Sequence, residues 1–125
     1  MGNSCSCQCS GGPKLIFACS GGSNLGHLTD QAARQLTKEG VGKMYCLTGI
    51  GGRVNAIMVN TQAASQILAI DGCELDCAKN CLKQAGFDQF EHLRLSDIGM
   101  KKGVTLVDAE SVNQVVSKAK EKLVC

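Results

Sequence analysis

The sequence predicts an α/β fold. We expect a single three-layer domain with a mainly parallel sheet of about four strands and helices on both faces, as in Rossmann-like or flavodoxin-like proteins. Short apolar runs alternate four times with longer segments of helical periodicity, and turn signals rich in glycine follow the first three runs. The 125 residues, 44% hydrophobic and 19% charged, suit one domain with a real core. We place this domain at residues 14–125, after a cysteine-rich tail at residues 1–13.

The first half of the domain contains two predicted strands, each followed by a turn and a helix. Residues 14–19 (KLIFAC) form the first strand and lead into a cluster of serine, glycine and asparagine. A helix over residues 25–39 follows, because leucines and alanines recur there at helical spacing and a serine or asparagine can cap its first turn. Residues 43–48 (KMYCLT) form the second strand, and a helix begins near residue 53.

The second half begins with the third predicted strand, at residues 67–70, which ends in an Asp-Gly turn. Residues 74–85 contain no glycine or proline and predict a helix with Leu75 on its apolar face. Residues 92–95 alternate in polarity as an edge strand would, and Asp108 is placed to cap a final helix. The alternation of strands and helices implies right-handed crossovers and parallel strands.

The overall composition argues against two classes of partner. The net charge is +2 with no basic run, and the chain has four aromatic residues, so we expect no nucleic-acid surface. No apolar stretch approaches the length of about 18 residues that a membrane span needs, so we expect no membrane partner. The first residues also lack the charged start and apolar centre of a signal peptide, which favours a cytoplasmic location.

Cysteine is the residue type that points to a function. Nine cysteines occur in 125 residues, an odd number in a chain whose core looks sufficient without disulfides. Together with the expected cytoplasmic location, this favours metal binding or redox chemistry over a disulfide framework.

Four of the cysteines are expected to meet at one edge of the sheet. Cys19 ends the first predicted strand, Cys46 lies near the end of the second, Cys73 follows the third, and Cys77 lies one helical turn later. The carboxyl ends of parallel strands share an edge, and strands about 4.8 Å apart would bring these thiols within reach of one ion. Four thiolates suit Zn²⁺, although an Fe–S cluster uses the same ligands. The competing interpretation is that each is a small core residue.

Further candidates surround this set. Asp71 could orient a ligand or act as a base, but an aspartate before glycine more often makes the turn. Cys81 is predicted to share one helical arc with Cys73 and Cys77, close to the apolar face, and is interpreted as a core residue or a reserve thiol. His27 could supply a fifth ligand, although an exposed histidine is the simpler interpretation.

The tail offers a separate set of thiols. It contains a C-x-C-x-C run formed by Cys5, Cys7 and Cys9. Such a run could bind a soft metal, Zn²⁺ or Cu(I), or could be incidental in a loose terminus.

Three short motifs resemble the DGC family of small bacterial proteins described as zinc-binding. The motifs are CSGG at residues 19–22, Cys46 with TGIGG at residues 48–52, and DGC at residues 71–73 with Cys77. The resemblance runs from about Lys14 to the C-terminus and leaves the tail outside. It implies Cys19, Cys46, Cys73 and Cys77 as zinc ligands, and it supplies no reaction.

The main alternative is thiol chemistry, which would make the protein a redox or sulfur-transfer enzyme. A helix N-terminus lowers the pKa of a thiol, so Cys19 or Cys73 could be a reactive thiolate. The layout also resembles low-molecular-weight phosphatases, but their C-x₅-R motif would need arginine where Leu25 stands. The expected partners are therefore a metal ion and a small molecule or thiol. The glycine-rich turns could also offer backbone N–H groups to an anion.

Overall fold

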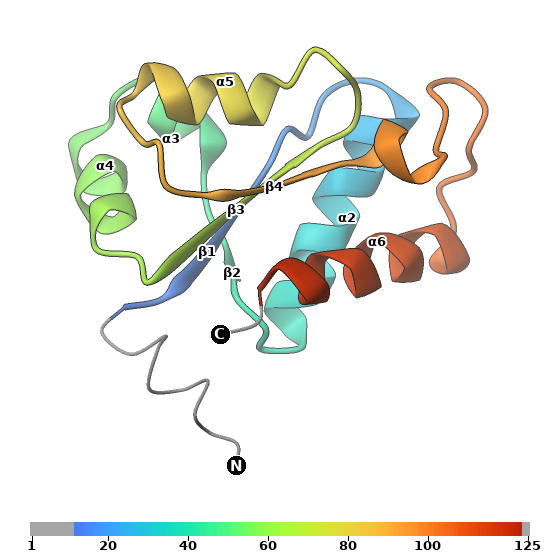
Figure 1. Cartoon of the computed structure of the whole chain (residues 1–125), viewed down its shortest axis with the longest axis horizontal. Coiled ribbons are helices and arrows are strands. Elements are labelled where there is room, and N and C mark those ends of the chain that lie inside the picture. The colour runs from blue at the N-terminus through green and yellow to red at the C-terminus, as the bar shows by residue number, and fades with distance from the viewer. Residues whose placement is uncertain (1–11, 124–125) are drawn as a thin grey trace.

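The computed structural model describes residues 12–123 and contains a four-stranded parallel sheet (Figure 1). Its strands are β1 (Lys14–Ala18), β2 (Lys43–Met44), β3 (Gln66–Asp71) and β4 (Glu91–Arg94). The strand order is β2-β1-β3-β4, and every neighbouring pair is parallel. This order is the flavodoxin-like one, so the α/β prediction is confirmed.

Helices cover both faces of the sheet, as predicted. On one face α2 (Asn24–Lys38) and α6 (Ala109–Lys122) pack together over a cluster of leucines, alanines and valines. The other face carries α3 (Leu47–Gly51), α4 (Asn55–Gln62) and α5 (Cys77–Gln84), which contribute to a second cluster that surrounds Phe17. Figure 1 shows the sheet between these two layers.

Two long helices begin where the sequence predicts. Ser23 caps α2, because its hydroxyl accepts a hydrogen bond from the amide of Gly26 at 3.2 Å. Asp108 caps α6 by accepting from the amide of Ser111 at 2.9 Å. The inward positions of α2 are fully buried: Leu25, Leu28, Ala32 and Leu36. Helical spacing was therefore a reliable guide on this face of the sheet.

The segment after β1 and α2 differs from the prediction. The second strand is shorter than expected, because the chain leaves β1 after the amide of Tyr45 donates to the carbonyl of Ile16 at 2.8 Å. A short helix, α3, begins at once, capped by the sulfur of Cys46, which accepts from the amide of Gly49 at 3.4 Å. Gly49 packs against Ile57 of α4, where a Cβ atom would lie 2.6 Å away, so this close approach requires glycine.

The helix predicted at residues 74–85 begins later, at Cys77, and the cause is Asp71. Both carboxylate oxygens of this buried residue accept backbone N–H groups of α5, from Ala78 at 2.7 Å and from Lys79 at 3.0 Å. The start of the helix is thus fixed at this capped turn. Residues 72–76 form a loop that ends at Asp76 with a left-handed φ of 53°.

Two expectations about this segment are therefore wrong. Cys73 lies in the loop, so it does not share one helical arc with the cysteines of α5. Leu75 is 69% exposed and belongs to no apolar helix face.

The remaining elements complete the sheet edge. β4 is an edge strand beside β3, as predicted, and the buried Leu93 anchors it. A 3₁₀ turn, η1 (Leu95–Ile98), follows and leads into a loop at residues 99–107. Among the described residues, no helix combines the length and the apolar character that crossing a bilayer requires.

Candidate functional site

The topology of the sheet creates a crevice between β1 and β3. The chain passes from β1 through α2 to β2 on one side, and β3 lies on the other side of β1. The loops at residues 19–23 and 72–76, which follow β1 and β3, therefore diverge to opposite faces of the sheet. In open α/β sheets, ligands bind at such a switch point, outside the carboxyl ends of the strands.

Three of the predicted site cysteines line a cavity in this crevice. Its volume is about 260 Å³, and its walls include Cys19 from the first loop, Cys73 from the second and Cys77 from the start of α5. Cys19 and Cys73 are half-buried and Cys77 is exposed. Asp71 and Lys102 also line the cavity. Soft sulfur ligands from two separate stretches of chain thus face a common space.

The charges around the cavity act on Cys77. Although Cys77 is exposed as a residue, partial desolvation of its thiol raises the pKa above its ordinary value, and the nearby Asp71 carboxylate and the sulfurs of Cys19 and Cys73 raise it further. Lys102 acts in the opposite direction. These groups are therefore close enough to sense one another, and the arrangement disfavours further negative charge unless a cation joins it.

Cys19 is held by a buried threonine. The hydroxyl of Thr29, a fully buried side chain, donates to the carbonyl of Gly26 at 2.7 Å and accepts from the amide of Ser20 at 3.1 Å. The sulfur of Cys19 lies 3.5 Å from the same hydroxyl oxygen. Because the carbonyl already takes the only hydroxyl proton, the thiol of Cys19 is the donor in this contact. Thr29 thereby fixes the position of the Cys19 sulfur at the end of β1.

Cys46 occupies a different place. It is exposed, caps α3 through its sulfur, and lines a neighbouring cavity of about 580 Å³ between the ends of β1 and β2. Cys19 lines both cavities, whereas Cys73 and Cys77 line only the first of these two. The four predicted ligands are thus arranged as three around one cavity and one beside it.

The other predicted thiols lie away from this cavity. Cys81 is half-buried, its sulfur contacts the carbonyl of Leu47 at 3.7 Å, and it packs against the apolar cluster under α5. Burial raises its pKa, in keeping with the interpretation as a core residue. His27 is exposed, as the simpler interpretation expects. Cys5, Cys7 and Cys9 lie outside the described residues.

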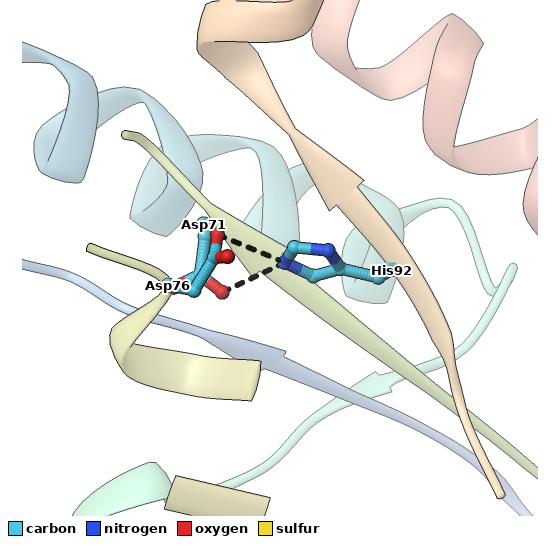
Figure 2. Close-up of side chains that lie close together, drawn as sticks. All are labelled: Asp71, Asp76 and His92. Carbon is cyan, nitrogen blue, oxygen red and sulfur yellow. Dashed lines mark hydrogen bonds and ion pairs between the residues drawn. The ribbon is translucent and has the colours of Figure 1, made fainter. Parts of the chain in front are cut away.

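A second cluster of potential ligands lies next to the crevice (Figure 2). The Nε2 atom of His92 on β4 is 2.8 Å from Oδ2 of Asp71 and 3.7 Å from Oδ1 of Asp76. These three ligand atoms lie within 4.8 Å of one another, as metal ligands do, so the trio is a possible metal-binding group. Among residues 12–123, no cysteine belongs to a group this compact.

The bonds around this trio favour a structural role. The Asp71 carboxylate caps α5, and Asp76 accepts from Nε of Arg94 at 2.8 Å and also from the other end of that guanidinium. The Arg94 hydrogen bonds hold the pKa of Asp76 below its usual value. An ion here would have to displace the helix amides or the guanidinium. The trio therefore ties β4 to the loop at residues 72–76, which carries Cys73.

Sequence reasoning missed several of these residues. His92 and Arg94 alternate along β4, so their common face was the one available signal. Asp76 and Lys102 lie in loops and carried no pattern at all. The one signal for Thr29 is that a polar residue occupies the otherwise apolar, buried face of α2.

Comparison with known proteins agrees with this architecture. The family model described as the DGC domain matches residues 15–119. A curated protein of Pseudomonas aeruginosa, the anaerobic and virulence modulator AnvM, is 39% identical over 88 residues, which are 70% of this chain and 67% of AnvM. No solved structure matches the chain. The family match and the DGC motif at residues 71–73, which lines the crevice, establish that this chain belongs to the DGC-domain family.

Proposed function

We propose that this protein binds Zn²⁺ through the thiolates of Cys19, Cys73 and Cys77. The observation that supports the proposal best is their common cavity at the switch point of the sheet. Zinc accepts thiolate ligands without a geometric preference of its own, and thiolates select soft or borderline metals over Mg²⁺ and Ca²⁺. Cys46 is the fourth ligand that the sequence predicts, and this assignment stays a prediction because Cys46 lines the neighbouring cavity.

The residues around the cavity fit a cation. Burial, the Asp71 carboxylate and the sulfurs of Cys19 and Cys73 raise the pKa of the Cys77 thiol, so this thiol favours its neutral form when no cation is near. A divalent ion would reverse this preference, because metal binding deprotonates its thiol ligands. The three sulfurs would have to draw together around the ion, at about 2.3 Å from it. Cys73 lies in the loop at residues 72–76, where no helix or strand holds the backbone.

A site built from free thiols works only where thiols stay reduced. We therefore propose a cytoplasmic protein whose zinc serves binding or structure rather than hydrolysis, because thiolate-rich zinc sites mostly have these roles. The proposed partners are the metal ion itself and a small molecule or thiol that reaches the crevice.

The decisive experiment is elemental analysis of the protein purified without added metal. We expect about one zinc per chain, lost in Cys19→Ser and in Cys73→Ser. Cys81→Ser is the matched control, because its sulfur contacts a carbonyl of α3 outside the cavity, and this variant should keep its zinc. Colour and iron in place of zinc would indicate an Fe–S cluster and contradict the zinc assignment. Wild-type protein with no metal, which also takes up none on titration, would contradict metal binding altogether.

Thiol redox chemistry is the second candidate, and one observation favours it. Cys73 and Cys77 line the same cavity four residues apart, so two thiols could form a disulfide with the release of two protons and two electrons to an oxidised thiol partner. Reaction of metal-free protein with oxidised glutathione tests this. A loss of two mass units, mapped to this pair and reversed by reduced thiol, would support the redox role, whereas stable reduced thiols would contradict it.

A further inference from the structure

The loop at residues 99–107 is held firmly against the crevice by one side chain. The amide nitrogen of Asn24, the first residue of α2, donates to the carbonyls of Lys101 at 3.2 Å and Thr105 at 2.8 Å. Its amide oxygen accepts from the backbone of Gly103 at 2.7 Å. All hydrogen-bonding groups of the asparagine that face the loop are thus used, and the loop has a defined position beside the helix.

This loop brings a lysine to the cavity of the three cysteines. Lys102, between the clamped residues, lines the cavity and lowers the pKa of the Cys77 thiol by its charge. Among the described residues, no other lysine, arginine or histidine lines this cavity. Within the same part of the chain, Lys102 has no ion-pair partner. A positive charge is therefore available at a site where soft sulfur ligands converge.

The cavity also has more room than an ion needs. Its volume of about 260 Å³ compares with about 30 Å³ for one water molecule in the liquid. Gly21 and Gly22 line the cavity, and a Cβ at either position would meet nothing within 4 Å, so there is open space beside the first loop. The crevice can thus hold the ion and a small molecule together.

Cys46 does not close the site in this arrangement. Its sulfur accepts from the amide of Gly49 at 3.4 Å, and Cys46 lines the neighbouring cavity and not this one. Three protein thiolates leave one position of a tetrahedral ion free, as in zinc sites that bind exogenous ligands.

From these observations we infer that the crevice binds a small thiol that carries an anionic group, an inference that rests on the zinc binding proposed above. Cys19, Cys73 and Cys77 would hold the ion, the ion would bind the thiolate of the ligand once its proton has left to solvent, and the ammonium of Lys102 would pair with the anionic group. Soft sulfur suits the ion and a carboxylate suits the ammonium, so the two ends of one molecule meet complementary groups.

The first test concerns the fourth ligand. Cys46→Ser keeps an oxygen that can cap α3, so the fold is preserved. We expect its zinc affinity to stay within about threefold of wild type, while Cys77→Ser loses at least about tenfold. If Cys46→Ser loses zinc as severely as Cys77→Ser, the inference is wrong and zinc binding by four cysteines stands. If wild-type protein binds no zinc, the proposed function itself fails.

The second test concerns the ligand. Protein loaded with Co²⁺ and reduced by a phosphine, with no other thiol present, is titrated with mercaptoacetate, and the d–d absorption is followed. We expect a saturable shift. Lys102→Met should weaken binding of mercaptoacetate about three- to tenfold and leave that of 2-mercaptoethanol, an uncharged thiol, unchanged.

Lys101→Met is the matched control, since Lys101 neighbours Lys102 but lies outside the cavity lining. An unshifted spectrum, removal of the metal by the thiol, or equal effects of the two lysine substitutions would overturn the inference.

Discussion

Removal of the Asp71 carboxylate should destabilise the domain more than any surface substitution. The side chain is 1% exposed and accepts three hydrogen bonds: from Ala78 at 2.7 Å, from Lys79 at 3.0 Å, and at 2.8 Å from the ring of His92 when its Nε2 carries a proton. Asp71→Ala leaves the amide of Ala78 buried without a partner and α5 without its cap. A buried donor without an acceptor lowers the free energy of unfolding by about 1–3 kcal/mol, and the loss of a helix cap lowers it by about 0.5–2 kcal/mol.

We therefore expect Asp71→Ala to lower the free energy of unfolding by about 3 kcal/mol, or Tm by roughly 10 °C for a domain of this size. Asp71→Asn keeps one carbonyl oxygen for the helix and should cost about half as much. Urea unfolding followed by circular dichroism measures both. Asp88→Ala is the matched control, because Asp88 is an exposed aspartate in the loop after α5.

The same substitutions should also affect the proposed zinc site, since Asp71 fixes the start of α5 after the loop that carries Cys73. We expect Asp71→Asn to weaken zinc binding about tenfold, an effect typical of groups that orient metal ligands. An Asp71→Ala protein as stable as Asp88→Ala, within about 0.5 kcal/mol, would refute the capping role. Unchanged zinc affinity in a folded Asp71→Asn would refute the link between the cap and the site.

Three further predictions concern charge and the tail. In metal-free protein, the raised pKa of Cys77 should make its alkylation slower than that of the same cysteine in unfolded chain until the pH exceeds the raised pKa, and mass mapping that finds it faster would contradict the stated electrostatics. The lowered pKa of Asp76 means that its pair with Arg94 stabilises the fold above the ordinary carboxylate pKa and loses this effect as pH falls through the lowered value. The stability difference between wild type and Arg94→Met should therefore be constant near neutral pH and shrink in acid, and a difference that stays the same as the pH falls through the acid range would refute it. Deletion of residues 1–11 should leave the zinc affinity of the crevice unchanged, because the chain enters β1 at its amino end, at the edge of the sheet opposite the crevice (Figure 1). A deletion that releases the zinc would contradict this.

The elements that the sequence predicted well are those fixed by local signals. The cap at Ser23, the apolar spacing of α2 and the apolar run of β3 each involve neighbours in the chain, and all three are confirmed. Parallel strands then brought Cys19 and Cys73 to the same edge, because strand direction alone determines where a strand ends.

The elements that the sequence predicted poorly depend on contacts between distant segments. The start of α5 is set by Asp71, seven residues before the amide of Ala78, and no local pattern encodes a cap at that distance. The turn of helix capped by Cys46 is too short to show periodicity. The network of Asp76, His92 and Arg94 joins a loop to an edge strand, so it became visible only once β3 and β4 were paired.

X-ray absorption at the zinc edge of the loaded protein identifies the atoms that bind the ion. We expect a first shell of at least three sulfur atoms at about 2.3 Å, supplied by the cysteines of the crevice. A shell of nitrogen and oxygen alone at about 2.0–2.2 Å would contradict it and would place the ion instead among Asp71, Asp76 and His92.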